Sequence, residues 1–246
     1  MKTNTNEIVY GFNSVMNILT GKRVPTKVLI MNNHHEPKIT SICKEKGIYV
    51  ESVDRHVLDR LSNNRNHQGV LAYVPPYEYG TLEDLINDLN KKNDALILIL
   101  DGIEDPNNFG SLIRSSACLG IDGILISKNH QVQLTPTVSK VSTGGEEHIR
   151  IYQVSNIAQS LIRLKKNGLW IVASDGSADR DYDEVNYKGK IGIVVGSEGK
   201  GISPLILKTS DFIVKIPMEG KITSFNAAVA GAILLTQAMN YKRRNK

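Results

Sequence analysis

The chain has 246 residues, of which 41% are hydrophobic, and carries a formal net charge of +5. This length can bury one or two domain cores, and the longest apolar runs, such as ALILIL, are far shorter than the roughly 20 residues that a membrane-spanning helix needs. We therefore expect a cytoplasmic globular protein with no membrane contact.

The N-terminal part alternates short helical and strand patterns. Helices are expected from about residue 13, over 38–47 and over 55–62, and strands over 27–31, 48–53 and 69–74. This alternation predicts a small α/β domain over residues 1–76. The paired prolines of PPYEYGT and a polar helix, LEDLINDLNKKN, follow. Because adjacent prolines fit neither a central strand nor a helix interior, residues 77–94 are interpreted as a linker.

Residues 95–246 form the second predicted domain, in which longer apolar strands alternate with helices. The strands are expected over 95–102, 123–126, 149–154, 170–174, 191–196 and 212–217, and the helices over 109–120, 135–145, 156–168, 203–210 and 224–244. Such alternation predicts an α/β fold with a mostly parallel sheet that is covered on both faces and binds ligands at the carboxyl ends of its strands.

The first strand-end loop reads LDGIEDPNNFGSLIRSS. The segment from Pro106 to Asn108 is typical of a turn and helix start, and Gly110 permits close backbone approach. Arg114, one helical turn later, could direct its guanidinium at a phosphate or carboxylate. The alternative makes Asn108 a helix cap and Arg114 a member of a surface ion pair.

The second loop, VVGSEGKGIS, places Glu198 inside a glycine-rich turn. It matches neither the P-loop nor the dinucleotide-binding pattern, which argues against a nucleotide-hydrolysing enzyme. A carboxylate would repel phosphate but suits a nucleoside with a positive centre. The alternative is an ordinary surface turn.

The third loop, IPMEGKITSFNAAVAGAILL, ends a strand at Pro217 and begins a long helix at Ser224 or Asn226. The alanines and glycine of this helix permit close packing against another element or another subunit. Ser224 could instead be a simple N-cap.

In this order the three loops resemble the motifs of the SpoU (TrmH-like) ribose 2′-O-methyltransferases of the SPOUT superfamily, over about residues 95–241. The segments YGFNSVMNIL and NHQGVLAYV further resemble the ribosomal-protein-like, RNA substrate-binding domain of the ribosomal RNA branch of that family. The resemblance implies methylation of a ribose 2′-hydroxyl in RNA, with a guanosine of 23S ribosomal RNA as the expected target.

The resemblance also implies S-adenosylmethionine as cofactor, a deep trefoil knot and a homodimer through the C-terminal helix region. No metal is expected, because the histidines and cysteines lack the spacing of metal ligands. The knot follows from the resemblance alone, since topology rules argue against proposing one. Methyl-donor contacts are implied for Gly196, Ser197, Gly199, Ile216, Met218 and Phe225, and polar active-site roles for Asn108, Arg114, Glu198, Ser224 and Asn226.

Phe225 departs from the family, which usually has leucine there. If the position contacts adenine through its backbone, the phenylalanine ring can add packing; if the side chain must fit a tight slot, cofactor affinity suffers. We favour the backbone contact.

The three motifs contain no histidine to serve as the base. We expect Arg114 to clamp the target phosphate and stabilise the developing alkoxide, while the other four polar residues orient the ribose and water.

Several other residues carry weaker expectations. His67 either contacts RNA or holds a turn, and Trp170 is expected in the core rather than as a stacking platform. Cys43 and Cys118 are expected to be core or near-core thiols, and the terminal KRRNK either a solvated helix end or a phosphate contact. The competing functions are a noncatalytic RNA-binding protein, which would not bind S-adenosylmethionine, and a transfer RNA methyltransferase.

Overall fold

The computed structural model describes residues 6–245, which form two compact units. Unit 1 runs to Glu78 and also contains Leu134–His148, whereas unit 2 contains Tyr79–Gln133 and the chain from Ile149 onward. The chain therefore passes from one unit to the other three times. This division differs from the expected boundaries at residues 76 and 94.

Unit 1 is built on a four-stranded sheet. Its strands are β1 (Glu7–Tyr10), β2 (Lys27–Met31), β3 (Tyr49–Val53) and β4 (Val70–Val74), in the order β1-β4-β2-β3. Only β2 and β3 pair in parallel. The short strand β1 was missed in the sequence, because four residues give too little alternation to be distinguished from a loop.

Three helices of unit 1 cover the two faces of this sheet. Helices α1 (Phe12–Thr20) and α2 (Pro37–Glu45) bury one core cluster that includes Val15, Ile39 and the thiol of Cys43. Helix α3 (Arg55–Leu61) inserts Leu58 into a second cluster against the other face. The predicted small α/β domain is thus present, with helices in the expected places.

The second stretch of unit 1 comprises α6 (Pro136–Ser142) and the 3₁₀ turn Gly145–Glu147. It packs on α1, where Ser14 Oγ donates to the carbonyl of Ser139 at 3.3 Å and Asn17 Nδ2 donates to that of Thr143 at 2.6 Å. The sequence pattern places this helix in the second domain, because periodicity reports a helix but not the partner on which it packs.

Arg23 is the main charged link within unit 1. Its guanidinium lies 2.6 Å from Glu147, 2.9 Å from Glu7 and 3.6 Å from Glu146. Both Glu146 and Glu147 have almost fully buried side chains. Burial disfavours the charge of Arg23, but attraction and hydrogen bonding to Glu147 outweigh it and raise the pKa of Arg23.

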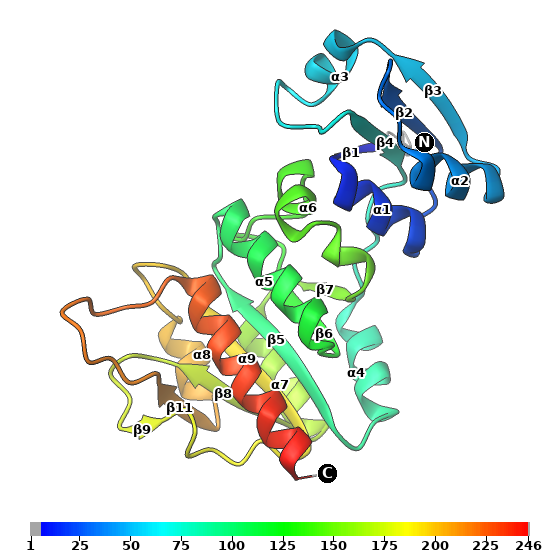
Figure 1. Ribbon diagram of the computed structural model, residues 1–246. Coiled ribbons are helices and arrows are strands. Elements are labelled where there is room, and N and C mark those ends of the chain that lie inside the picture. The colour runs from blue at the N-terminus through cyan, green and yellow to red at the C-terminus, as the bar shows by residue number, and fades with distance from the viewer. Residues whose placement is uncertain (1–5, 246) are drawn as a thin grey trace. The chain divides into compact units, whose positions relative to one another are not determined.

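Unit 2 contains a seven-stranded sheet in the order β7-β6-β5-β10-β8-β11-β9, with every pairing parallel (Figure 1). Its strands are β5 (Ala95–Asp101), β6 (Gly123–Ser127), β7 (Ile151–Val154), β8 (Leu169–Ser174), β9 (Arg180–Asp181), β10 (Lys190–Gly196) and β11 (Phe212–Lys215). The predicted parallel sheet is confirmed. The chain order is broken where the late strand β10 inserts between β5 and β8.

One face of this sheet is covered by α4 (Leu82–Asn90), α7 (Ile157–Lys166) and α8 (Pro204–Thr209). Leu82, Leu85 and Leu89 of α4 are buried in the same core as the sheet residues Ile97 and Ile171. Helix α4 is therefore part of unit 2 rather than part of a linker. It looked like a linker in the sequence because its many polar residues mask a continuous apolar stripe.

The other face of the sheet is covered by α5 (Pro106–Leu119) and α9 (Ala227–Arg244), which lie side by side (Figure 1). A Cβ atom added to Gly231 of α9 would lie 2.5 Å from Leu112 Cδ2 of α5. The small-residue helix thus permits a close approach, as expected, at Gly231.

Three residues of unit 2 differ from their expected environments. Trp170 is 53% exposed. Its neighbours on β8 point to the face covered by α7 and α8, so Trp170 points to the opposite face, where α9 covers β5 and β10. Cys118 is exposed, since it lies off the buried face of α5. Lys242, in the basic tail, is buried and donates at 2.5 Å both to Asp94 Oδ1 and to the Gly189 carbonyl.

Among the described helices, none is long and apolar enough to span a membrane.

Candidate active site

The loop after β5 positions Asn108. Asp105 caps α5, because its Oδ1 accepts from the backbone N–H of Asn107 at 2.6 Å. Pro106 occupies the first turn, where its missing N–H costs nothing. Asn108 follows inside the helix with its side chain buried. The alternative in which Asn108 caps the helix is therefore wrong.

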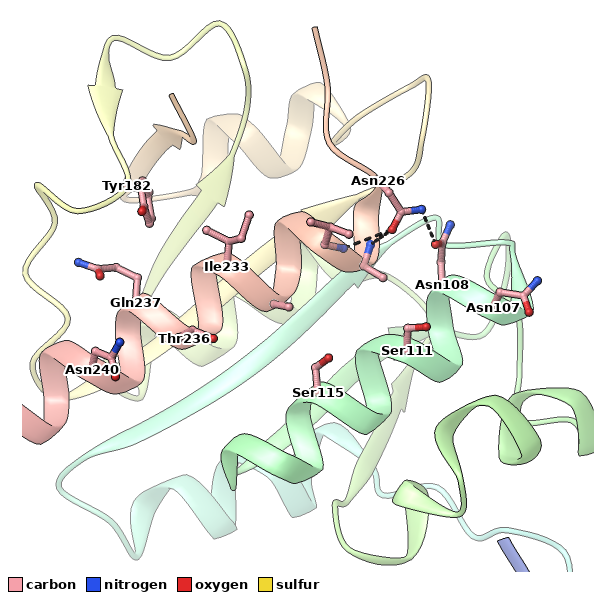
Figure 2. A pocket seen from close by; sticks show the side chains of 13 residues that line it. Asn107, Asn108, Ser111, Ser115, Tyr182, Asn226, Ile233, Thr236, Gln237 and Asn240 are labelled. Atoms are coloured by element: carbon pink, nitrogen blue, oxygen red, sulfur yellow. Dashed lines mark hydrogen bonds between the residues drawn. The ribbon is translucent and has the colours of Figure 1, made fainter. Parts of the chain in front are cut away.

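Asn226 begins α9 and is its N-cap. Its Oδ1 accepts from the N–H groups of Ala228 at 2.9 Å and Val229 at 3.2 Å. The amide nitrogen must then face away from the helix, and it donates to Asn108 Oδ1 at 2.8 Å (Figure 2). Ser224 lies two residues before the cap, so its interpretation as an N-cap is wrong.

Glu198 joins these two asparagines into a hydrogen-bonded triad, Asn108–Glu198–Asn226. Glu198 Oε1 accepts from Asn108 Nδ2 at 3.0 Å, from Asn226 Nδ2, and from the Ala227 N–H at 3.4 Å. One carboxylate oxygen thus links the loop after β10 to the first turns of α5 and α9. The three residues come from distant segments of the chain, and all three were predicted as polar active-site residues.

Three cavities meet at the triad. The helix cavity, of about 760 Å³, lies along α5 and α9 and is lined by Asn108 and Asn226. The loop cavity, of about 570 Å³, is lined by Glu198 and Asn226. The outer cavity, of about 670 Å³, is lined by Asn108 and Glu198. Each triad residue therefore borders two of the three cavities.

The loop cavity holds all six residues for which methyl-donor contacts are implied: Gly196, Ser197, Gly199, Ile216, Met218 and Phe225. Ser224 lines it as well. Other lining residues, including Ser174 and Gly176, were not predicted, although their position at and just beyond the carboxyl end of the apolar strand β8 was a usable signal.

Backbone contacts fix the shape of the glycine turn. Ser197 and Gly201 exchange two hydrogen bonds, at 3.2 Å and 3.0 Å. A Cβ atom at Gly196 would lie 2.2 Å from the carbonyl carbon of Gly201, and Gly199 has φ +94°. Gly196 must lack a side chain because the backbone of Gly201 occupies that space, and Gly199 adopts a positive φ that favours glycine. Backbone groups of the turn therefore face the cavity.

The charge of the loop cavity is unusual for a nucleotide site. Among the described residues that line it, Glu198 alone carries a charge. A phosphate would meet a carboxylate and no lysine or arginine, whereas a cationic nucleoside would meet a favourable charge. The volume and the donor set therefore fit a sulfonium nucleoside such as S-adenosylmethionine.

Arg114 is not brought to the triad. It is exposed on α5, lines none of the three cavities, and has no hydrogen bond or ion pair with any residue that the structure describes. The alternative surface ion pair is therefore absent among the residues that the structure describes, and the contact of Arg114 with a ligand stays a prediction.

Two protein-family models match this chain. Residues 95–236 match the model of the SpoU rRNA Methylase family, and residues 8–80 match the model described as RNA 2′-O ribose methyltransferase substrate binding. The chain belongs to the SpoU rRNA methylase family. It is an RNA 2′-O-ribose methyltransferase, and its methyl donor is S-adenosylmethionine.

Individual members of the SpoU family align over nearly the whole chain. A Bacillus subtilis (strain 168) protein assigned to the TrmH family of tRNA/rRNA methyltransferases is 39% identical, over 97% of this chain and 96% of the relative. The crystal structure of an RNA 2′-O ribose methyltransferase is 26% identical, with a TM-score of 0.82, and covers 98% of this chain and 90% of its own.

A third comparison concerns the fold. The SpoU methyltransferase AviRb from Streptomyces viridochromogenes, in complex with AdoMet, superposes with a TM-score of 0.82 at 20% identity and covers 97% of this chain and 91% of its own. The fold of this chain is thus shared with most of a known SpoU methyltransferase structure.

Proposed function

We propose that this enzyme methylates the ribose 2′-hydroxyl of a guanosine in 23S ribosomal RNA. The observation that carries the methyl-transfer site is the triad, which borders a nucleoside-sized cavity where Glu198 is the one charged residue among the described lining residues. The ribosomal target is supported by the separate α/β unit at the N-terminus and by its match to the substrate-binding model. A transfer RNA target is the competing outcome.

The residues of the loop cavity and of the triad divide into two proposed groups. Gly196, Ser197, Gly199, Ile216, Met218 and Phe225 would hold the methyl donor, largely through their backbone. When bound, S-adenosylmethionine supplies an electrophilic methyl group. Glu198 contributes the negative charge, and Ser224, Asn108 and Asn226 orient the ribose. Phe225 lines the cavity and is 42% exposed, so its ring has room beside a bound nucleoside.

Arg114 clamps the target phosphate and stabilises the developing alkoxide. Since it has no described partner within the chain, we propose that it acts across a homodimer formed through α9. The helix cavity is lined by Ser111, Ile233, Thr236 and other uncharged residues of α5 and α9 (Figure 2). This uncharged face suits an interface with a second copy, which would bring Arg114 on α5 to the other subunit.

Two further expectations belong to this proposal. A trefoil knot is supported by the position of β10, which follows β8 in the chain yet separates it from β5. A cytoplasmic location is supported by the RNA substrate and by the two free thiols, Cys43 and Cys118.

The proposal is tested by calorimetric titration of the protein with S-adenosylmethionine, followed by methyl transfer to unmodified 23S ribosomal RNA and to transfer RNA, with mapping of the methylated ribose. Arg114→Ala should retain donor binding and lower the transfer rate by about 100-fold or more. Arg60→Ala, an exposed arginine on α3, is the control and should transfer normally.

The outcomes separate the competing functions. Methylation of transfer RNA alone would replace the ribosomal target. Absence of donor binding by the folded protein would overturn the proposed donor site in the loop cavity. Full activity of Arg114→Ala would remove Arg114 from the active site.

A further inference from the structure

Unit 1 has a cavity of its own, which we name the 62–69 cavity after the loop that forms one wall. Its volume is about 740 Å³, and it shares no lining residue with the three cavities at the triad. Helix α3 contributes Arg55 and Asp59, and the loop contributes Asn64 and the residues up to Gly69. Phe12, Met31, His34 and Glu36 complete the lining.

The backbone of this loop is held in a costly conformation. Asn63, Asn64 and Gln68 have φ angles of 54°, 57° and 51°, and Gly69 has φ 75°. Positive φ is uncommon for residues other than glycine, although asparagine tolerates it better than glutamine does. Such positions persist only where surrounding contacts fix them, and they concentrate at binding sites.

His67 supplies the first of these contacts. Its Nδ1 accepts from the N–H of Gly69 at 3.0 Å, so the ring proton lies on Nε2, which faces Asp59 Oδ1 at 3.0 Å. The imidazole is buried. Of the two alternatives for His67, the structure therefore supports the hydrogen-bonded turn.

Two further side chains tie the loop to its surroundings. Gln68 Oε1 accepts from the N–H of Phe12 at 3.2 Å and from Lys140 Nζ at 2.7 Å. Arg65 donates to Thr137 Oγ1 and lies 3.4 Å from the Tyr10 hydroxyl. These contacts order the loop without using Asn64 or Asn66, whose side-chain amides have no hydrogen bond to any described residue.

The lining is chemically mixed rather than purely basic. The cations of Arg55 and Arg65 are matched by the carboxylates of Glu36 and Asp59. This balance does not suit a run of phosphates, but the amides of Asn64 and Asn66 can read the donors and acceptors of a base edge. Phe12 and Met31 offer an apolar surface, and Arg55, whose side chain is 77% exposed, can reach one phosphate.

We propose that the 62–69 cavity binds one unpaired nucleotide of the RNA substrate. Sequence-specific proteins recognise RNA mainly at unstacked bases in loops and bulges, through base edges and flat side-chain surfaces. Asn64 and Asn66 contact the base edge, and Arg55 contacts the adjoining phosphate. The inference rests on the proposed function, because it assumes that the substrate is RNA.

The test compares Asn66→Ala and Arg55→Ala with the control Arg60→Ala, which removes an exposed arginine from the same helix but outside the cavity. The substrate is whichever transcript, 23S ribosomal RNA or transfer RNA, the wild-type enzyme methylates. Each cavity variant should raise the KM for RNA about tenfold, with unchanged kcat at saturating RNA and unchanged affinity for S-adenosylmethionine. Arg55→Ala should also weaken the salt dependence of RNA binding, and Arg60→Ala should match the wild type.

A second measurement needs no substitution. The same transcript carrying 4-thiouridine should, on irradiation, cross-link to a peptide that contains residues 62–69. The inference is overturned if the wild-type enzyme methylates RNA while both cavity variants keep the wild-type KM, or if cross-links lie wholly outside this cavity. If the cavity variants weaken RNA binding but no methyl transfer occurs, the inference stands and the proposed function fails.

Discussion

At the residue scale, Glu198 shows how one side chain can serve structure and charge together. Its Oε1 receives N–H groups from Asn108, Asn226 and Ala227, so it connects the starts of two helices. The same carboxylate is the charge that the loop cavity offers to a cationic ligand. The resemblance in the sequence pointed to Glu198, but its hydrogen-bond partners depend on amide orientations that only the folded structure fixes.

Glu198→Gln separates the two roles, because the amide keeps an acceptor oxygen and loses the charge. We expect the affinity for S-adenosylmethionine to fall about tenfold, as for one lost charge interaction of about 1.4 kcal/mol, with little change in the free energy of unfolding. Calorimetry and urea denaturation measure the two quantities. Glu219→Gln, at an exposed position that lines none of the three cavities, is the control. Equal donor affinity in both variants would contradict a role for the charge.

At the element scale, the sequence predicted strands and helices well but did not predict which helix or sheet face covers a given residue. The parallel strands were predictable, since runs such as ALILIL are buried on both sides. Environments that depend on a neighbouring element were not. Trp170 resembles a core residue but lies beyond the cover of α9, and Cys118 occurs in an apolar-looking helix yet faces solvent. The glycine turn was recognisable. The end of strand β8 marked Ser174 only as a strand-end residue, and the sheet order, with β8 beside β10, places it in the same cavity as that turn.

The two cysteines provide a test of these helix faces. Burial raises the pKa of the Cys43 thiol, which reduces its thiolate at any given pH and slows alkylation. Cys118 is exposed. We expect iodoacetamide at neutral pH to modify Cys118 in the native protein and Cys43 only after unfolding, as peptide mass spectrometry can measure. Modification of both at equal rates in native buffer would contradict the burial of Cys43.

At the scale of the whole molecule, the two units are not two consecutive pieces of chain. Leu134–His148 crosses into unit 1 and is anchored there by Arg23. The Arg23 side chain is 11% exposed, and the side chains of Glu146 and Glu147 are 0% and 1% exposed. Removing the guanidinium would leave two buried carboxylates without their cation, which costs more than the pair itself contributes.

Arg23→Ala should therefore lower the free energy of unfolding by about 3–5 kcal/mol, measured by urea denaturation. The neighbouring Lys22→Ala removes an exposed cation and should change stability by less than about 0.5 kcal/mol. Because the pKa of Arg23 is raised, its contribution is kept as pH rises from neutral to the ordinary arginine pKa and is lost as pH rises through the folded-state value. A loss of less than about 1 kcal/mol would show that the cluster is hydrated in solution.

The split composition of unit 1 also sets an order of events during synthesis. A ribosome releases the chain from the N-terminus, and domains generally fold as units once their residues have emerged. Unit 1 cannot complete its Arg23 cluster until the chain has emerged through His148. At that point β5 and β6 are already available, but β10, the strand that joins β5 to β8, is not. Unit 1 can therefore be finished while the sheet of unit 2 still lacks its central strand, so a nascent chain that stalls at this point would have a folded unit 1 and an incomplete unit 2.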